Sequence, residues 1–66
     1  MRARINGKYM DFDGDTSILS LLELKGINPE SVVVEHNHEI PKRESWAEII
    51  LCEGDNIEIV KFMGGG

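Results

Sequence analysis

The alternation of apolar and polar residues at the start of the chain predicts a β-hairpin. Residues 2–6 and residues 8–13 each alternate with the period of two that is typical of a half-buried strand. Asn6 and Gly7 stand between these segments, and both residue types tolerate the positive φ that a two-residue turn requires. We therefore expect two antiparallel strands joined by a tight turn.

A helix of about ten residues is predicted after the hairpin. Thr16 is the expected N-cap, because its hydroxyl can accept a hydrogen bond from the first turn. Gly26 suits a left-handed C-terminal cap, and Pro29 prevents the helix from continuing. The residues that give this segment its helical spacing are Ile18, Leu21, Leu22 and Lys25.

The second half of the chain is predicted to form strands and one short helical turn. Residues 31–36 contain three consecutive valines, which indicate burial on both faces, as in a central strand. Asn37 and His38 are typical of a turn, and residues 39–41 of a short edge strand that ends at a proline. Residues 43–50 favour a helical turn anchored by Trp46 in the core, and residues 57–62 form the last strand.

The predicted order is strand, strand, helix, strand, short strand, strand. A hairpin and one main helix packed across a mixed sheet of four or five strands make up the α+β, β-grasp fold of ubiquitin-like proteins. We expect a single domain over residues 1–63, followed by a flexible tail over residues 64–66.

Composition limits the kinds of function that this chain can have. A folded chain of 66 residues builds one thin core and leaves little room for a small-molecule pocket of roughly 300–1,000 Å³. We therefore expect a protein that is not an enzyme. A single cysteine, Cys52, forms no internal disulfide, and we expect it to be buried or inert. Without a membrane span or a signal peptide, the expected location is the cytoplasm.

The charge of −5 is concentrated in the second half of the chain. Between Glu30 and Glu58 there are eight acidic side chains, opposed by Lys42 and Arg43. Such a surface repels phosphate backbones, so nucleic acid is not expected as a partner. It suits a basic protein partner, although an acidic face that only keeps the protein soluble explains the charge equally well.

Three glycines, Gly64, Gly65 and Gly66, follow the last predicted strand. An enzyme that activates a carboxylate has to thread it into a narrow channel beside ATP, where side chains would clash and glycine has none. Three extended residues reach about 10 Å beyond the strand. The Gly66 carboxylate is therefore the candidate working group, carried on Gly64 and Gly65. A frayed chain end is the competing interpretation.

The chain resembles the ThiS family, the sulfur carriers of thiamin biosynthesis. The likeness covers nearly the whole length and is strongest after residue 36. One difference is the order Pro41-Lys42-Arg43, where the family has adjacent proline and arginine. The residues that carry the resemblance are Asn37, Ile40, Arg43, Trp46, Gly54, Asp55, the segment Ile57-Glu58-Ile59-Val60, Gly65 and Gly66.

The resemblance implies that the Gly66 carboxylate is adenylated by a partner of the ubiquitin-activating type. That partner would use ATP and magnesium, so this chain itself would bind no cofactor. The carboxylate would then become a thiocarboxylate, with sulfur that a cysteine desulfurase releases from cysteine, and thiazole synthase would receive the sulfur. Carriers for molybdopterin, cysteine synthesis or tRNA thiolation share this fold and tail, as do protein modifiers, so these functions remain alternatives.

Two further groups of residues have candidate roles. Phe62 and Met63 precede the tail and are candidates for docking against the activating enzyme, although both could simply complete the core strand. His36 and His38 would share one side of a strand, but a third ligand at suitable spacing is missing, so no metal site is expected.

Overall fold

The chain begins with the predicted hairpin. In the computed structural model, which describes residues 1–62, β1 (Arg2–Ile5) pairs antiparallel with β2 (Lys8–Asp11). Asn6 and Gly7 form the turn with φ values of 50° and 83°, in the left-handed region that these residue types tolerate. The hairpin is confirmed, and β2 ends two residues earlier than the sequence predicts.

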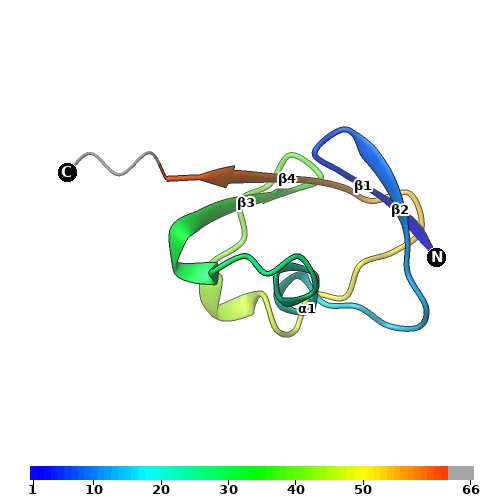
Figure 1. Ribbon diagram of the computed structural model, residues 1–66, viewed down its shortest axis with the longest axis horizontal. Helices are drawn as coiled ribbons and strands as arrows, with labels where there is room; N and C mark the ends of the chain where they lie inside the picture. Colours follow the sequence, from blue (N-terminus) through cyan, green and yellow to red (C-terminus); the bar gives the residue numbers. More distant parts are fainter. Residues whose placement is uncertain (63–66) are drawn as a thin grey trace.

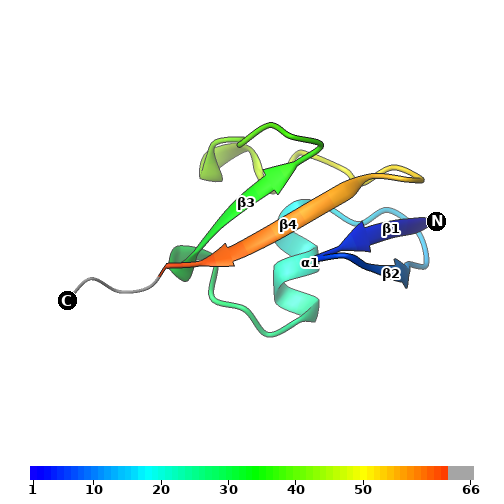
Figure 2. The same ribbon diagram turned by 90° about the horizontal axis from the view of Figure 1, so that it is seen from above.

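The four strands of the described chain form one mixed sheet in the order β2-β1-β4-β3 (Figures 1 and 2). The last strand, β4 (Asn56–Lys61), lies parallel to β1 and antiparallel to β3 (Val32–His36). The valine-rich strand is therefore at the edge of the sheet, and its predicted central position is wrong. Val32 and Val34 are buried in the core, whereas Val33 lies on the other face opposite Val60 and is partly buried.

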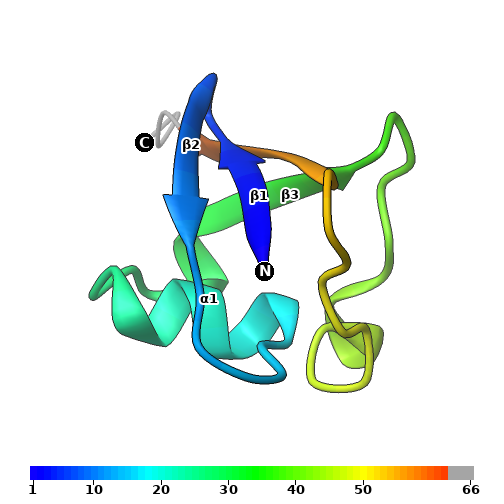
Figure 3. The ribbon, with the colours of Figure 1, turned by 90° about the vertical axis from the view of Figure 1, so that its right-hand side faces the viewer.

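Helix α1 (Ile18–Leu24) lies across one face of the sheet, as Figure 3 shows. The predicted cap is wrong by one residue: the Ser17 hydroxyl accepts a hydrogen bond from the Ser20 amide at 3.0 Å. Thr16 is buried instead, and its carbonyl accepts the Leu51 amide. Gly26 ends the helix with a φ of 68°, as predicted. No helix within residues 1–62 is long and apolar enough to cross a membrane.

The connection from β3 to β4 is mostly irregular. Asn37 and His38 form the predicted turn, both with positive φ. Glu39 then makes an isolated bridge to His36 and the chain leaves the sheet, so the predicted strand over residues 39–41 does not form. Two short 3₁₀ turns complete the fold: η1 (Pro29–Ser31) before β3 and η2 (Arg43–Ser45) after it.

The core lies between α1 and the inner face of the sheet. Trp46 closes it beside η2: its side chain is 3% exposed, and its Nε1–H donates to the Pro41 carbonyl at 3.2 Å. The predicted role of Trp46 as a core anchor is confirmed. The other buried apolar side chains are Ala3, Ile5, Phe12, Ile18, Leu21, Leu22, Val32, Val34, Leu51 and Ile57.

Replacing Trp46 with alanine is expected to lower the free energy of unfolding by about 3–5 kcal/mol, because it removes a large buried side chain and leaves a cavity. Urea denaturation followed by circular dichroism measures the loss. Leu24→Ala, at a helix position that is 69% exposed, is the control and is expected to change the value by less than about 1 kcal/mol. Equal losses in the two variants would show that Trp46 does not anchor the core.

Candidate functional site

The residues predicted to act lie at the end of β4. Met63 and the three glycines Gly64, Gly65 and Gly66 fall outside the described residues. Phe62 is the last described residue, and β4 leads directly to it along the length of the sheet (Figure 2). Its backbone N–H donates to the Ser31 carbonyl at 2.8 Å, so the pairing with β3 extends one residue beyond Lys61.

The outer face of the sheet, opposite α1, carries an apolar patch at this end. We call Val33, Val60 and Phe62 the outer patch. Val60 lies directly opposite Val33 on the neighbouring strand, and Phe62 follows Val60 at the strand period of two. Val60 is 59% exposed and Phe62 is 51% exposed. The interpretation that Phe62 completes the core is therefore wrong.

Val60 is a surface residue that the sequence analysis did not single out. The signal was present, because Ile57, Ile59, Val60 and Phe62 place apolar side chains on both faces of one strand. The structure assigns Ile57 to the core and Val60 to the outer face.

Two carboxylates lie beside the outer patch. Glu35 and Glu58 are direct cross-strand partners on the same face, two pairs further from the chain end than Val33 and Val60. Like charges directly opposite each other repel, and a basic side chain placed between them relieves that repulsion. Two of the eight acidic side chains of the second half of the chain are thus placed beside the apolar surface.

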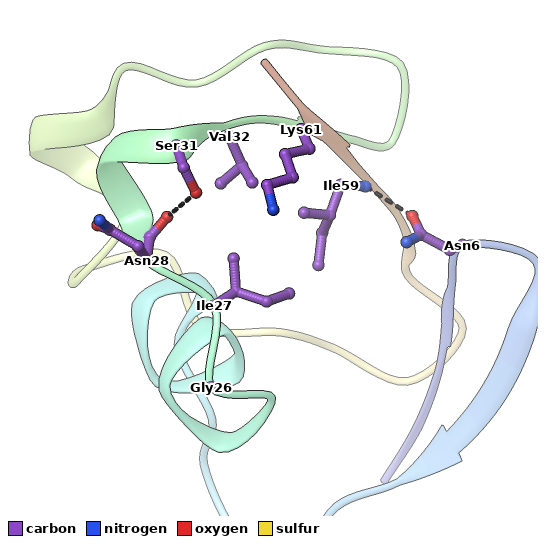
Figure 4. A pocket seen from close by; sticks show the side chains of 8 residues that line it. All are labelled: Asn6, Gly26, Ile27, Asn28, Ser31, Val32, Ile59 and Lys61. Carbon is purple, nitrogen blue, oxygen red and sulfur yellow. Dashed lines mark hydrogen bonds between the residues drawn. The ribbon is translucent and has the colours of Figure 1, made fainter. Parts of the chain in front are cut away.

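The opposite side of the β4 end borders a cleft of about 520 Å³ (Figure 4). The expectation that the chain has little room for a pocket is wrong, because β1 ends at Ile5 while β4 continues past it and the chain swings away after Gly26. Among the described residues that line the cleft, Lys61 is the one ionisable side chain. The lining residues are Asn6, Gly26, Ile27, Asn28, Ser31, Val32, Ile59 and Lys61.

The start of β4 is fixed by a cluster of polar side chains around Asp55. The carboxylate of Asp55 accepts hydrogen bonds from the Asn37 amide at 3.0 Å and the Cys52 backbone N–H at 2.8 Å, and it lies 2.9 Å from His36 Nε2. Asn37 Oδ1 in turn accepts the Asn56 backbone N–H at 2.8 Å. Asn37 and Asp55, two residues of the predicted family motif, therefore hold the turn at residues 37–38 against the strand.

The electrostatics of Asp55 follow from these contacts. Burial would raise the pKa of its carboxyl group, but hydrogen bonds from Asn37, His36 and the Cys52 amide together hold that pKa below its usual value. The ionised form of Asp55 is thus part of the folded structure.

Cys52 and the histidines form no recognisable reaction centre. The Cys52 thiol is exposed, so of the expected alternatives, buried or inert, burial is wrong and inertness stays a prediction. His36 pairs with the Asp55 carboxylate, and His38 lies in the exposed turn. Within residues 1–62, no three His, Cys, Asp or Glu side chains are arranged to hold a metal ion.

Comparison with known proteins identifies the family. The ThiS family model matches residues 3–66. The chain belongs to the ThiS family. It is 42% identical to the sulfur carrier protein ThiS of Bacillus subtilis over 64 residues, which is 96% of this chain and 97% of that protein. The crystal structure of the thiamine biosynthesis protein ThiS from Geobacter metallireducens superimposes with a TM-score of 0.84 at 38% identity, over the full length of both chains.

Two longer relatives also match. Thiazole synthases of Paramagnetospirillum magneticum and Magnetococcus marinus are 38% and 36% identical to all 66 residues of this ThiS-family chain. The chain spans about a fifth of the length of each of them. The predicted ThiS family and the predicted β-grasp fold are both confirmed by these comparisons.

Asp55→Asn is expected to lower the free energy of unfolding at pH 7 by about 1–2 kcal/mol, because it weakens hydrogen bonds to a charged acceptor. Since the pKa of Asp55 is lower in the folded than in the unfolded chain, its stabilisation is present above the unfolded pKa of about 4. It is lost as the pH falls through the folded value. Urea denaturation from pH 7 to pH 2 measures this difference between wild type and variant.

Asp11→Asn is the matched control. The Asp11 carboxylate pairs with Arg2 at 2.9 Å, and the guanidinium lowers the pKa of Asp11, but the pair is exposed and screened by solvent. A smaller loss than for Asp55→Asn is expected. Equal losses for both variants, or a loss for Asp55→Asn that does not shrink in acid, would contradict the stabilising role of Asp55.

Proposed function

We propose that this ThiS-family chain is a sulfur carrier of thiamin biosynthesis and that the Gly66 carboxylate is its working group. The observation that carries the proposal is the 42% identity to a sulfur carrier over nearly the whole of both chains. The fold supports it, because β4 leads from the centre of the sheet directly to the predicted tail. The chain's own side chains would position the carboxylate and catalyse nothing.

The proposed chemistry needs one group from this chain. A carboxylate oxygen of Gly66 attacks the α-phosphate of ATP, pyrophosphate leaves, and an acyl-adenylate forms. A persulfide sulfur derived from cysteine then attacks the acyl carbon and displaces AMP, which gives an acyl disulfide, and a thiol reductant cleaves the S–S bond to leave the thiocarboxylate. ATP and magnesium would be bound by an adenylating partner of the ubiquitin-activating type. Gly64 and Gly65 would let the chain end enter that partner's channel without side-chain clashes.

The acceptor of the sulfur would be thiazole synthase. In two bacteria a thiazole synthase contains a region similar to this entire chain, which supports a functional link between the two proteins. Sulfur from a cysteine desulfurase would enter before this step. We place the chemistry in the cytoplasm, and the exposed Cys52 thiol fits a reducing compartment.

The adenylating partner would dock on the outer patch. Val60 and Phe62 offer exposed apolar area immediately before the tail, and the neighbouring Glu35 and Glu58 would attract basic side chains. Phe62 would contribute its ring, while its backbone stays paired with Ser31. Met63 stays the second predicted docking residue.

Co-expression with a ubiquitin-activating-type enzyme and a cysteine desulfurase is expected to add about 16 Da to the intact protein, the replacement of one oxygen by sulfur. Intact-protein mass spectrometry measures the gain. The control is the chain without Gly66, which is expected to remain unmodified. No gain with an enzyme that hydrolyses ATP in the presence of the carrier would contradict the carrier chemistry. A ladder of conjugates with other proteins would favour a modifier.

Phe62→Ser is expected to raise the Kd for the adenylating enzyme about tenfold, because it removes a large apolar side chain from the centre of the contact. Isothermal titration calorimetry measures the Kd, and circular dichroism verifies the fold. Leu24→Ser is the matched control, since Leu24 is also a large exposed apolar side chain but lies on α1. An unchanged Kd for Phe62→Ser, or an equal effect of both variants, would exclude the outer patch as the docking surface.

A further inference from the structure

Strand β4 loses its neighbour on one side before it ends. Its parallel pairing with β1 covers Asn56 and Ile57, and the chain then turns away at Asn6 and Gly7. The side chain of Asn6 provides one more rung: its Oδ1 accepts the Ile59 backbone N–H at 2.6 Å (Figure 4). Beyond this rung, within residues 1–62, β4 has a paired strand on its β3 side alone.

The register shows which backbone groups face the open side. In an antiparallel pair, alternate residues direct both N–H and C=O towards the partner strand. Phe62 donates to Ser31, so residues 58, 60 and 62 bond with β3, while residues 57, 59 and 61 face the other way. The Asn6 contacts with the Ile57 carbonyl and the Ile59 amide agree with this assignment. The Lys61 N–H and C=O therefore face the side that β1 has left.

The cleft lies along this open edge. Ile27, Val32 and Ile59 give it apolar walls, and the Lys61 side chain lies at its mouth (Figure 4). A strand that continued β1 past Asn6 would direct alternate side chains into this space, because Ala3 and Ile5 on β1 already face the core. A cleft of about 520 Å³ is large enough for an apolar side chain of any size.

We propose that an extended segment of the adenylating partner adds to the open edge of β4, continuing the sheet where β1 ends. This proposal rests on the proposed function for the identity of the partner. A backbone carbonyl of the segment accepts a hydrogen bond from the Lys61 N–H. One apolar side chain of the segment enters the cleft, and one carboxylate lies near the Lys61 ammonium group. The segment occupies the edge of β4 that faces away from β3. The outer patch lies on the face of the sheet opposite α1. The partner would therefore contact the end of β4 from two directions.

The other sheet edges are less suited to such a segment. The outer edge of β3 borders another hollow, of about 480 Å³, but that hollow lies across β3 from β4, and its lining includes the charged residues Lys42, Arg43 and Glu44. The outer edge of β2 lies across β1 from β4, at the far side of the sheet. The β4 edge combines backbone groups that are unpaired within residues 1–62, an apolar cleft and a position at the end of the last strand, and a lysine there attracts an acidic partner segment.

Amide hydrogen exchange tests the strand pairing. We expect the Lys61 amide of the 15N-labelled carrier to exchange at least about tenfold more slowly when the adenylating enzyme is bound without ATP, because its N–H gains a backbone acceptor. The Val34 amide, which faces the outer edge of β3, is the internal control and keeps its rate. Unchanged exchange at Lys61 in the saturated complex, or protection at Val34 instead, would overturn the proposal.

Charge reversal tests the chemistry of the segment. Lys61→Glu is expected to raise the Kd for the enzyme about tenfold, because two carboxylates would then face each other beside the cleft. Lys42→Glu makes the same change at the N-cap of η2, beside β3, and is expected to leave the Kd within about twofold. Equal effects of the two variants on the Kd would show a general effect of charge. They would overturn the proposal that an acidic segment of the partner lies beside Lys61.

The enzyme used in both experiments is the one that gives the 16 Da gain. A mass gain without protection at Lys61 would overturn the strand pairing and leave the carrier chemistry intact. No mass gain with an active enzyme would overturn the proposed function, and the named partner with it.

Discussion

The parallel pairing of the first strand with the last strand is the interaction on which the arrangement of the site depends. Arg4 donates to the Asp55 carbonyl and Asn6 donates to the Ile57 carbonyl, both at 2.8 Å, which places β4 beside β1 in the middle of the sheet. A central last strand is held on both sides where it begins. The predicted tail therefore follows a strand whose start is held in the middle of the sheet.

The length of the hairpin decides how far this constraint extends. If β1 continued past Asn6, it would cover the full length of β4, and the cleft would be filled by the side chains of its own sheet. The turn at Asn6 and Gly7 stops β1 early, and the Asn6 side chain satisfies the Ile59 amide that β1 no longer reaches. One turn thus closes the hairpin, terminates the central ladder and leaves backbone groups of Lys61 available to a partner.

Much of this fold was predictable from short-range patterns, and the errors have physical reasons. The positive φ at Asn6, Gly7 and Gly26 follows from the conformations that these residue types allow, so the hairpin turn and the helix end were predicted correctly. The helix start was missed because Thr16 and Ser17 are both good caps, and a contact between the Thr16 carbonyl and Leu51, 35 positions away in the chain, decides between them. Sequence patterns do not contain such long-range contacts.

The same limit explains what was missed at the candidate site. Three valines indicated a central strand buried on both faces, but the sheet order places that strand at the edge and leaves Val33 only partly buried. Phe62 was recognised as a docking candidate from its place before the glycines, whereas Val60 needed the register that sets it opposite Val33. The cleft was not foreseeable from composition, because it results from two strands that differ in length and not from any residue that lines it.

Support for β4 decreases along its length, and this gradient fits a carrier better than a catalyst. At its start the strand has β1 on one side, β3 on the other, and the Asp55 cluster behind it. At Lys61 and Phe62 the described backbone contacts come from β3 and from Ser31, the residue that precedes β3. A catalyst needs its reacting group fixed against other side chains of the same chain. A carrier needs a fixed base and a chain end that another protein can hold, and regions that change partners are drawn from the less stable parts of a fold. Sequence changes that lengthened β1 would therefore stabilise the domain while obstructing its proposed use.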